Sequence, residues 1–404
     1  MRWILALVVL LSTSVLAQPA AEATSDLEVS LLTFGPGQVY WERFGHNAIV
    51  VRDRRNGEAT SYNYGIFDFD EDHFIANFAR GHMTYQIAAN RVEDDIAWYA
   101  ESGRFVIEQK LRFNATQARA LKDFLEWNVK PENVRYRYDY YTQNCSTKVR
   151  DALDTALGGS LRQQLVSPSQ GYTYRLLTGA LTSPQPMLMA GLDLGLGPYA
   201  DRALSFWDDS FVPMQLMAHL RDIRIVDAAG NAQPLVLEER VIAAGRNAAP
   251  PPLPPDLRWP FLAAGVAIAS ALLILSGRRS SVVARRTFAA LAVTISLLCG
   301  IAGIVMLALW GFTEHRSAWR NENLLVLSPL CLLLVSGWWR FARSDWKPGV
   351  LLRVISLVVA LLAGFALFAK VLPWFTQSNV PWILLLLPAH FALAAIARRD
   401  SAIE

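Results

Sequence analysis

The last third of this 404-residue chain carries five long apolar segments, and they constrain its fold more than any other feature. A membrane-spanning helix needs about 20 consecutive residues that are mostly apolar. Arginines near the ends of the third and fourth segments can extend their charged groups to the membrane surface. We therefore expect an all-α transmembrane domain with five helices over residues 259–397. The segments are residues 259–277, 287–313, 324–341, 350–375 and 380–397.

The charged residues between these segments predict the orientation of the domain. Lys and Arg are enriched in residues 277–286, in residues 340–347 and in the C-terminal tail, whereas the other connecting loops contain fewer. Cytoplasmic loops of membrane proteins carry an excess of Lys and Arg. We therefore expect a cytoplasmic tail at residues 398–404, and residues 18–256 on the outer side of a bacterial inner membrane.

The first 17 residues predict export independently of the loops. In MRWILALVVLLSTSVLA, one arginine precedes an apolar run, and Val15 and Ala17 are small residues at the −3 and −1 positions of a cleavage site. This pattern is typical of a secretory signal peptide, which is removed after export. An uncleaved anchor helix is the alternative, although the run is short for a membrane span. Both signals place the N-terminal domain in the periplasm.

Charge divides the chain in the same way as hydropathy. Residues 257–404 have a formal net charge of +9, whereas residues 18–256 have a net charge of −7, with 23 Lys and Arg against 30 Asp and Glu. An acidic domain repels polyanions, so nucleic acid is excluded as a partner of the exported part.

The exported residues 18–247 predict an α+β domain, and the proline-rich residues 248–258 predict a stiff, extended linker to the membrane. LEVSLLTF and HNAIVVRD have the composition of strands, and Asn56-Gly57 predicts a hairpin between HNAIVVRD and TSYNYGIF. Helical spacing of apolar residues follows a capping asparagine in NATQARALKDFLEWNVK, and it recurs over residues 145–157.

Cys145 is the one cysteine of the exported domain, since Cys299 and Cys331 fall within the apolar segments. A lone thiol in an oxidising compartment is either a buried filler or a reactive nucleophile. The motif QNCST places Cys145 in the first turn of a predicted helix, capped by Asn144 or Thr142. Free amides and the positive end of the helix dipole favour a thiolate there, and they can also bind an oxyanion.

A nucleophilic cysteine needs a general base, and histidine is the usual one. His46 is the strongest candidate, because Gly45 before it allows another backbone or a substrate to approach closely. The other histidines of the exported domain occupy a predicted short helix or an apolar surrounding, where structural roles are more common: His73, His82 and His219.

These motifs together resemble a known family. FGHNAIVV, YNYGIFDF and QNCST at a helix start, followed by a multi-span C-terminal region, are similar to the Lnb-type lipoprotein N-acyltransferases. The resemblance implies a circularly permuted NlpC-type papain-like fold, in which the catalytic histidine precedes the cysteine, as His46 precedes Cys145. It implies that Cys145 takes an acyl chain from a phospholipid as a thioester and passes it to the N-terminal amine of a lipoprotein, without a cofactor.

The third catalytic group of such a site is expected on the strand after the histidine, where Asn63, Tyr64 and Asp68 are available. In a regular hairpin centred on Asn56-Gly57, Asn63 shares the face of His46 but lies opposite Val50, about 13 Å along the strand at ~3.3 Å per residue. Direct contact then requires a bulge or a register shift. We predict Asn63 as the third residue.

Further candidates surround this triad. Asn144, Tyr64 and Tyr141 are expected to help position the site or bind the oxyanion. The outer loop FTEHRSAWRNENLL places His315, Asn321 and Asn323 at the membrane surface, either as a solvated loop or as a lid or headgroup-binding element below Cys145.

Two other functions remain open from the residues alone. NlpC-type domains commonly act as cysteine peptidases or amidases on cell-wall peptides, and a non-enzymatic membrane sensor would not need the thiol. A metal hydrolase is not expected, because the sequence has no H-E-x-x-H or comparable ligand spacing.

Overall fold

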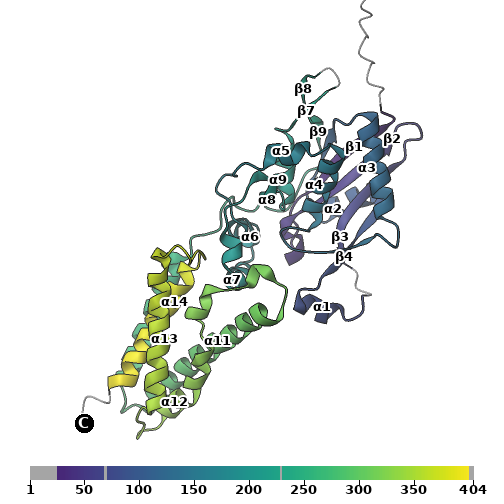
Figure 1. Cartoon of the computed structure of the whole chain (residues 1–404). Helices are drawn as coiled ribbons and strands as arrows, with labels where there is room; N and C mark the ends of the chain where they lie inside the picture. Colours follow the sequence, from purple (N-terminus) through teal and green to yellow (C-terminus); the bar gives the residue numbers. More distant parts are fainter. Residues whose placement is uncertain (1–24, 68–70, 228–229, 400–404) are drawn as a thin grey trace, which may run out of the picture.

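The computed structural model describes residues 25–67, 71–227 and 230–399, and it divides into a sheet-containing N-terminal domain and a helical C-terminal bundle (Figure 1). The predicted signal peptide, residues 1–17, lies outside the described residues. Within them, the N-terminal domain contains a seven-stranded sheet of order β6-β4-β3-β2-β1-β5-β9. Its strands are β1 (Leu27–Phe34), β2 (His46–Asp53), β3 (Ala59–Phe67), β4 (Thr84–Arg91), β5 (Val106–Leu111), β6 (Arg135–Arg137) and β9 (Val236–Ala243).

The sheet alternates apolar side chains between two covered faces, as the period of a strand requires. Leu31 and Ile49 belong to the core formed with the helices α3 (Ala115–Asn128) and α4 (Cys145–Ala156). Leu32 and Val50 face the opposite side, where they pack with α2 (Val92–Glu101). The central strands are therefore buried on both sides, and this fixes their register.

The hairpin between β2 and β3 forms where Asn56-Gly57 predicts it, but its register differs from the expected one. Asp53 N–H donates to the Glu58 carbonyl, which leaves residues 54–57 as a four-residue loop. Asn63 consequently pairs with Ala48 instead of Val50. The shift brings Asn63 two residues closer to His46 along the strand and keeps it on the same face.

Residues 160–247 connect the sheet to the membrane helices. Their strand β9 completes one edge of the sheet beside β5, and two of their helices, α6 and α7, lie next to the bundle (Figure 1). The elements are α5 (Ser160–Leu165), α6 (Tyr174–Thr182), α7 (Pro186–Gly195), η2 (Pro198–Asp201), α8 (Phe206–Asp209), α9 (Pro213–Leu220), β7 (Arg224–Val226) and β8 (Ala232–Pro234).

Among the described residues, four helices are long and apolar enough to cross a membrane: α10 (Arg258–Gly277), α11 (Val282–Phe312), α13 (Val350–Phe368) with its extension to Val371, and α14 (Val380–Arg398). The predicted third span is a broken segment, in which residues 316–325 and 329–342 are inclined by 45°. The expectation of five helices is met only if this segment counts as one span.

The break in the third segment has a local cause. Pro329 begins a 3-10 helix, η5 (Pro329–Leu334), which continues into α12 (Val335–Trp339) and η6 (Arg340–Ala342). A side chain at Gly303 of α11 would collide with the Leu327 carbonyl and with Pro329. The segment therefore lies directly on the backbone of α11.

The C-terminal end of α14 and the helix α12 both lie at the end of the bundle that is remote from the sheet (Figure 1).

Candidate active site

Cys145 is the first residue of α4, and its position is fixed by a capping box at Asn144. The Asn144 side chain accepts a hydrogen bond from Thr147 N–H (2.9 Å), and Thr147 Oγ1 accepts one from Asn144 N–H (2.8 Å). The Asn144 amide also donates to the carbonyls of Tyr140 and Phe211. Its polar atoms are thus engaged in holding the helix start, so Asn144 positions the thiol through the cap.

The space for the thiol arises where β3 separates from β2. The two strands stop pairing at Ala48 and Asn63, and β3 is irregular around Gly65, which has a φ of +91°. A Cβ atom on Gly65 would lie 3.3 Å from the Cys145 Cβ. The backbone N–H of Asn47, the residue after His46, then hydrogen-bonds to the Cys145 sulfur. The sulfur and the imidazole therefore lie at the same end of β2.

A chain of hydrogen bonds fixes the tautomer of His46. Its Nε2 lies 3.0 Å from Asn63 Oδ1, while Asn63 Nδ2 donates to Asp95 Oδ2 at 2.7 Å. Because an ionised carboxylate only accepts, the Asn63 amide must present its NH2 group to Asp95 and its oxygen to His46. Nε2 therefore carries the proton, and Nδ1 is left as the basic nitrogen. Asn90 holds the other Asp95 oxygen (2.8 Å).

Burial sets the protonation of both groups. Although part of each residue is exposed, burial lowers the pKa of His46 to about 4 and raises the pKa of Cys145 to about 11. Backbone N–H groups of Asn47 and Ser146 and the charge of Arg104 oppose the rise at Cys145. The sequence predicted a helix start that favours thiolate, but desolvation outweighs it. At neutral pH the pair consists of a thiol and a neutral imidazole.

An aromatic and cationic cluster lies behind the imidazole. The ring of Tyr99 stacks on His46 (centroids 5.7 Å apart) and on Phe34 (3.8 Å), and the Arg104 guanidinium lies 4.4 Å from the centroid of Tyr99. Arg104 is 4% exposed and lowers the pKa of both His46 and Cys145. A positive charge here favours a neutral base and a negative sulfur.

Asp95, Tyr99 and Arg104 were not identified from the sequence. In VEDDIAWYAES, Asp95 reads as one of three acidic residues in a first helical turn, which is ordinary chemistry for a helix N-terminus. Only the packing of α2 across β3 turns this carboxylate toward Asn63. Tyr99 follows Asp95 by four residues, so the helical period places both on the same face of α2. This spacing was the sequence signal that could have linked the two residues.

Two predicted positioning residues lie elsewhere. The Tyr64 hydroxyl donates to Asn128 Oδ1 (2.7 Å) at the end of α3, and its ring belongs to the core beneath the sheet. Tyr141 stacks on Tyr174 and its hydroxyl lies 3.2 Å from Thr178 Oγ1, in a separate cluster. Burial raises the pKa of Tyr136 and Tyr138, and a thiolate at Cys145 would raise it further, as it would for Tyr99.

The predicted residues of the outer loop after α11 lie in two different places, His315 beside α1 and Tyr140, and Asn321 and Asn323 at the domain junction. His315 Nε2 lies 3.0 Å from the Phe78 carbonyl of α1 (Phe74–Arg80), and its ring stacks on Tyr140 (6.0 Å). Asn321 and Asn323, which were expected at the membrane surface, are 2% and 0% exposed. Both donate to carbonyls at the end of α7, so their side chains face protein instead of a lipid headgroup.

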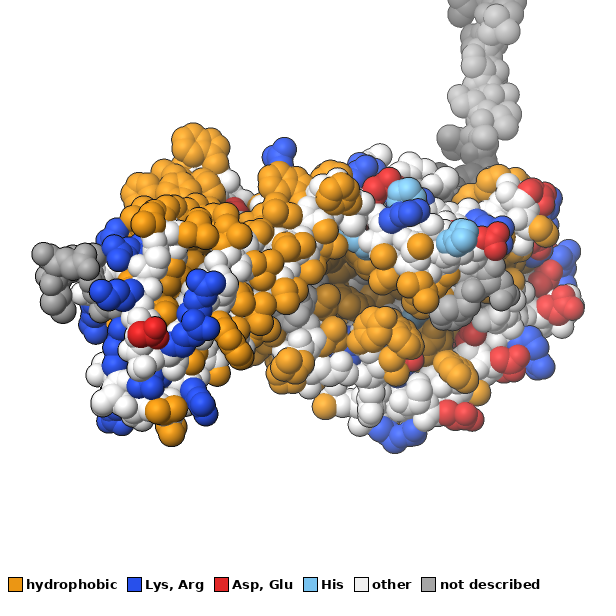
Figure 2. Space-filling view, turned by 90° about the horizontal axis from the view of Figure 1, so that it is seen from below, with side chains coloured by type: hydrophobic (Ala, Val, Ile, Leu, Met, Phe, Trp, Pro, Cys, Tyr) orange, Lys and Arg blue, Asp and Glu red, His pale blue; other side chains and the backbone are white. Residues whose placement is uncertain are grey.

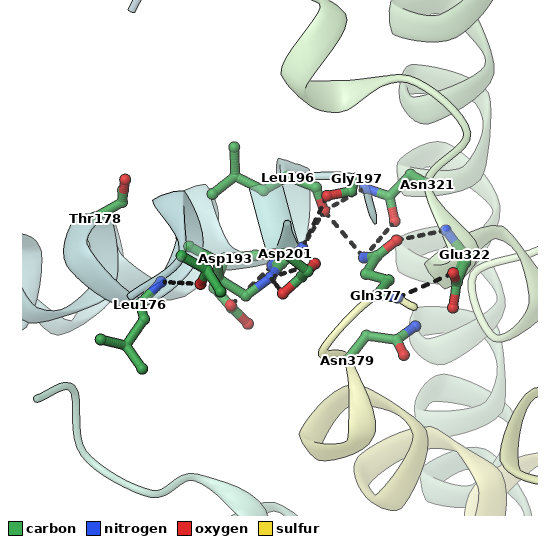
Figure 3. A network of polar contacts seen from close by, with 12 residues as sticks. Leu176, Thr178, Asp193, Leu196, Gly197, Asp201, Asn321, Glu322, Gln377 and Asn379 are labelled. Carbon is green, nitrogen blue, oxygen red and sulfur yellow. Dashed lines mark hydrogen bonds and ion pairs between the residues drawn. The ribbon is translucent and has the colours of Figure 1, made fainter. Parts of the chain in front are cut away.

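Figure 3 shows the polar network in which these amides take part. The Gln377 side chain donates to the Leu196 carbonyl and to Asn321 Oδ1, both at 3.0 Å. Its Oε1 accepts from Glu322 N–H, and Glu322 Oε1 accepts from Gln377 N–H. Arg175 of α6 binds Asp201 and Asp193 and donates to the Leu196 carbonyl (2.8 Å). The network attaches the N-terminal domain to the loops of the bundle.

Within the described residues, no group of three or more His, Cys, Asp or Glu side chains is arranged to hold a metal ion. The arrangement that remains is a thiol at a helix start, an imidazole with a free Nδ1, and an amide that orients this imidazole. It is built on an α/β domain that a helical bundle fixes to a membrane. This combination defines a membrane-attached protein with a candidate Cys-His-Asn site.

Comparison with known families agrees with the motifs. Residues 19–180 match the Lnb N-terminal periplasmic domain, and residues 260–399 match the Lnb transmembrane domain. The chain therefore belongs to the Lnb family, a family of membrane proteins with a periplasmic N-terminal domain. No curated protein and no solved structure matches it.

Proposed function

We propose that this protein is a cysteine-dependent acyltransferase with a papain-like site in a permuted chain order, His46 before Cys145. It takes an acyl chain from a phospholipid and transfers it to the N-terminal amine of a lipoprotein. The observation that carries the proposal is the hydrogen-bonded series His46–Asn63–Asp95 beside a thiol at a helix start. It supplies an oriented general base to a nucleophile.

In the first half-reaction, His46 Nδ1 takes the proton of Cys145 as the sulfur attacks the carbonyl carbon of a phospholipid ester. The tetrahedral intermediate collapses, the ester C–O bond breaks, and the imidazolium returns the proton to the departing lysophospholipid oxygen. A thioester remains on Cys145. The neutral ground state of both groups suits this route, because the proton moves only as the bond forms.

In the second half-reaction, the α-amine of a lipoprotein attacks the thioester carbonyl. His46 takes a proton from the amine, the C–S bond breaks, and the sulfur leaves with a proton from the imidazolium. An amide and the free thiol result. The N–H groups of Asn47 and Ser146, which hydrogen-bond to the sulfur in the resting site, are the proposed donors to the oxyanion of both intermediates.

The attachment to the bundle supports a membrane-bound substrate. Glu314 and His315, which follow α11, contact α1 through the Arg80 and Phe78 carbonyls (2.8 and 3.0 Å). The same His315 stacks on Tyr140, five residues before the nucleophile. We place the domain on the periplasmic face of the inner membrane, with the tail in the cytoplasm. A soluble cell-wall amidase would gain nothing from this proximity to lipid.

The test is incubation of the purified full-length protein with vesicles of phospholipid bearing a labelled acyl chain, followed by mass spectrometry of the Cys145 peptide. The proposal expects a hydroxylamine-sensitive acyl adduct on Cys145, and transfer of the label to a diacylated lipopeptide with a free amine. Asn144→Ala is the comparison variant, because it keeps the Cys145 thiol and removes the cap that positions it. Release of cell-wall peptides without any adduct would instead support the amidase, and would overturn the proposal.

A further inference from the structure

Large apolar side chains are exposed on two short elements of the N-terminal domain, one of which, α1, contacts the loop that follows α11. The 3-10 helix η1 (Tyr40–Phe44) exposes Tyr40 and Trp41, and α1 exposes Phe78 together with Ile75, which is 81% exposed. In soluble proteins such clusters mark interaction sites. Figure 2 shows hydrophobic side chains running from the membrane helices onto the N-terminal domain, around a hollow on the face seen from below.

The position of α1 relative to the membrane is set by the end of α11. Phe312, the last residue of that membrane helix, is 84% exposed, as expected of a lipid-facing side chain at the outer surface. Glu314 N–H, two residues later, donates to the Arg80 carbonyl at the end of α1, and Arg137 and His82 bind the Glu314 carboxylate. The helix α1 is thus held at the depth where α11 leaves the membrane.

A row of aromatic rings connects these two exposed elements. From η1, Trp41 contacts Phe67 (centroids 6.4 Å apart), Phe67 contacts Tyr85 (4.6 Å), and Tyr85 stacks on Tyr138 (4.0 Å). The second half of the row runs from Tyr138 through Tyr140 and His315 to Phe78 of α1, with spacings of 6.0, 6.0 and 6.3 Å.

The middle of this row adjoins the nucleophile. Phe67 of the row lies two residues after Gly65 on β3, and a Cβ on Gly65 would lie 3.3 Å from the Cys145 Cβ. Tyr138 precedes the turn that leads to Cys145, and Tyr140 begins that turn. Tyr85 and Tyr136 are paired across β4 and β6. The α1 end of the row is therefore held at the level where α11 leaves the membrane, and its middle lies near the start of α4, where Cys145 is.

We propose that η1 and α1 insert their exposed apolar side chains into the outer leaflet, and that the aromatic row between them guides a lipid acyl chain to Cys145. This rests on the proposed acyltransferase function and adds the route of the donor. Aromatic rings with one polar end suit the border of a membrane, where one side is apolar and the other hydrated. The continuity of the patch with the end of α11 identifies lipid, and not a protein, as the occupant.

Insertion can be measured without catalysis. Ile75→Cys and the control Val226→Cys are made in a Cys145→Ser background, labelled with bimane and reconstituted as full-length protein into phosphatidylcholine vesicles. Val226 is 72% exposed on β7, at the far end of the domain from the bundle (Figure 1). The proposal expects lipids brominated on their acyl chains to quench the label at position 75 and to leave the label at 226 unchanged.

The insertion would be overturned if the label at position 75, like the label at position 226, fluoresced equally in brominated and in unbrominated vesicles. A second outcome would also overturn it: the label at position 75 is shielded from water but is not quenched by brominated lipid. If that label became exposed when the protein was diluted, the result would indicate a protein partner. Neither outcome depends on whether Cys145 is acylated, so the proposed function could fail while insertion stands.

The guiding role is tested by comparing two acyl donors. For Ile75→Ser we expect Cys145 acylation from vesicle phospholipid to fall by about tenfold, since one buried isoleucine is lost from the lipid contact. Acylation by a short-chain, water-soluble thioester should fall far less, and Val226→Ser should change neither rate. An equal fall for both donors would refute the guiding role, because it would indicate general damage to the site.

Discussion

The thiol site and the domain junction both contain buried polar side chains, but they use them differently. At the junction, the side chains of Asn321 and Gln377 donate hydrogen bonds to backbone carbonyls and hydrogen-bond to each other. At the site, within the part of the chain that the structure describes, only Nε2 of the His46 ring is engaged in a hydrogen bond, and a buried Arg104 Nη2 has no partner. Buried polar groups therefore indicate chemistry only where hydrogen-bonding capacity is left over.

The largest effect tests the site side of this comparison. Cys145→Ala should abolish acyl transfer, a loss of at least about 1,000-fold, because no other group can form the thioester. Unfolding in detergent should change little, since alanine keeps the Cβ of Cys145 and the Asn144 cap that fixes the helix start remains. Thioester formation is read by mass spectrometry. Residual transfer near the original rate would mean that the thiol is a filler.

The junction should show the opposite behaviour. Arg175→Met leaves Asp193 and Asp201 without their cation, and breaking a buried ion pair in this way costs about 3–5 kcal/mol of unfolding free energy. Thermal unfolding of the full-length protein measures it. Arg258→Met is the control, because its pair with Asp256 is exposed to solvent and contributes little to stability. Equal losses from both variants would contradict a structural network at the junction.

Asn63 tests whether orientation of the base matters. In Asn63→Ala the imidazole loses the acceptor that fixes its tautomer, and we expect a fall in kcat of about 100-fold with little change in KM. The acid limb of the pH profile should also move to lower pH, because the hydrogen bond that His46 donates to Asn63 raises the pKa of His46. Loss of stability with an unchanged profile would reduce Asn63 to a packing residue.

The pH dependence of the wild type follows from burial. The pKa of His46 is lowered to about 4 in the folded protein, so the imidazole stays neutral, and able to accept a proton, until the pH falls toward 4. At pH 5.5 the rate should therefore be about tenfold higher than a histidine with the usual pKa of about 6.5 would allow. An acid limb near pH 6.5 in kcat/KM would show that the ring is hydrated.

The smallest effect concerns the gap between β2 and β3. Gly65→Ala adds a Cβ 3.3 Å from Cys145 in a backbone with φ +91°, whereas Gly57→Ala adds one at φ +77° with nothing within 4 Å. Both carry a backbone cost of roughly 1–2 kcal/mol. Only Gly65→Ala should also slow thioester formation, by a few-fold. Equal rates in the two variants would show that the gap does not position the thiol.

Local sequence determined a large part of this protein. Apolar runs identified the membrane helices, since a bilayer imposes a minimum length, and the break at Pro329 is itself a local property of proline. The Asn144 cap placed Cys145 at a helix start, and the motif order placed His46 before it. The family match to both parts of the chain agrees with these motifs.

Tertiary structure decided the remainder, because it depends on contacts between distant residues. The four-residue loop after Asp53 set the register that brings Asn63 to His46, and packing of α2 supplied Asp95. Burial changed both pKa values against the expectation from the helix start. Asn321 and Asn323, which the sequence predicted at the membrane surface, are buried at the domain junction. The partners of a side chain depend on which distant segments fold against it.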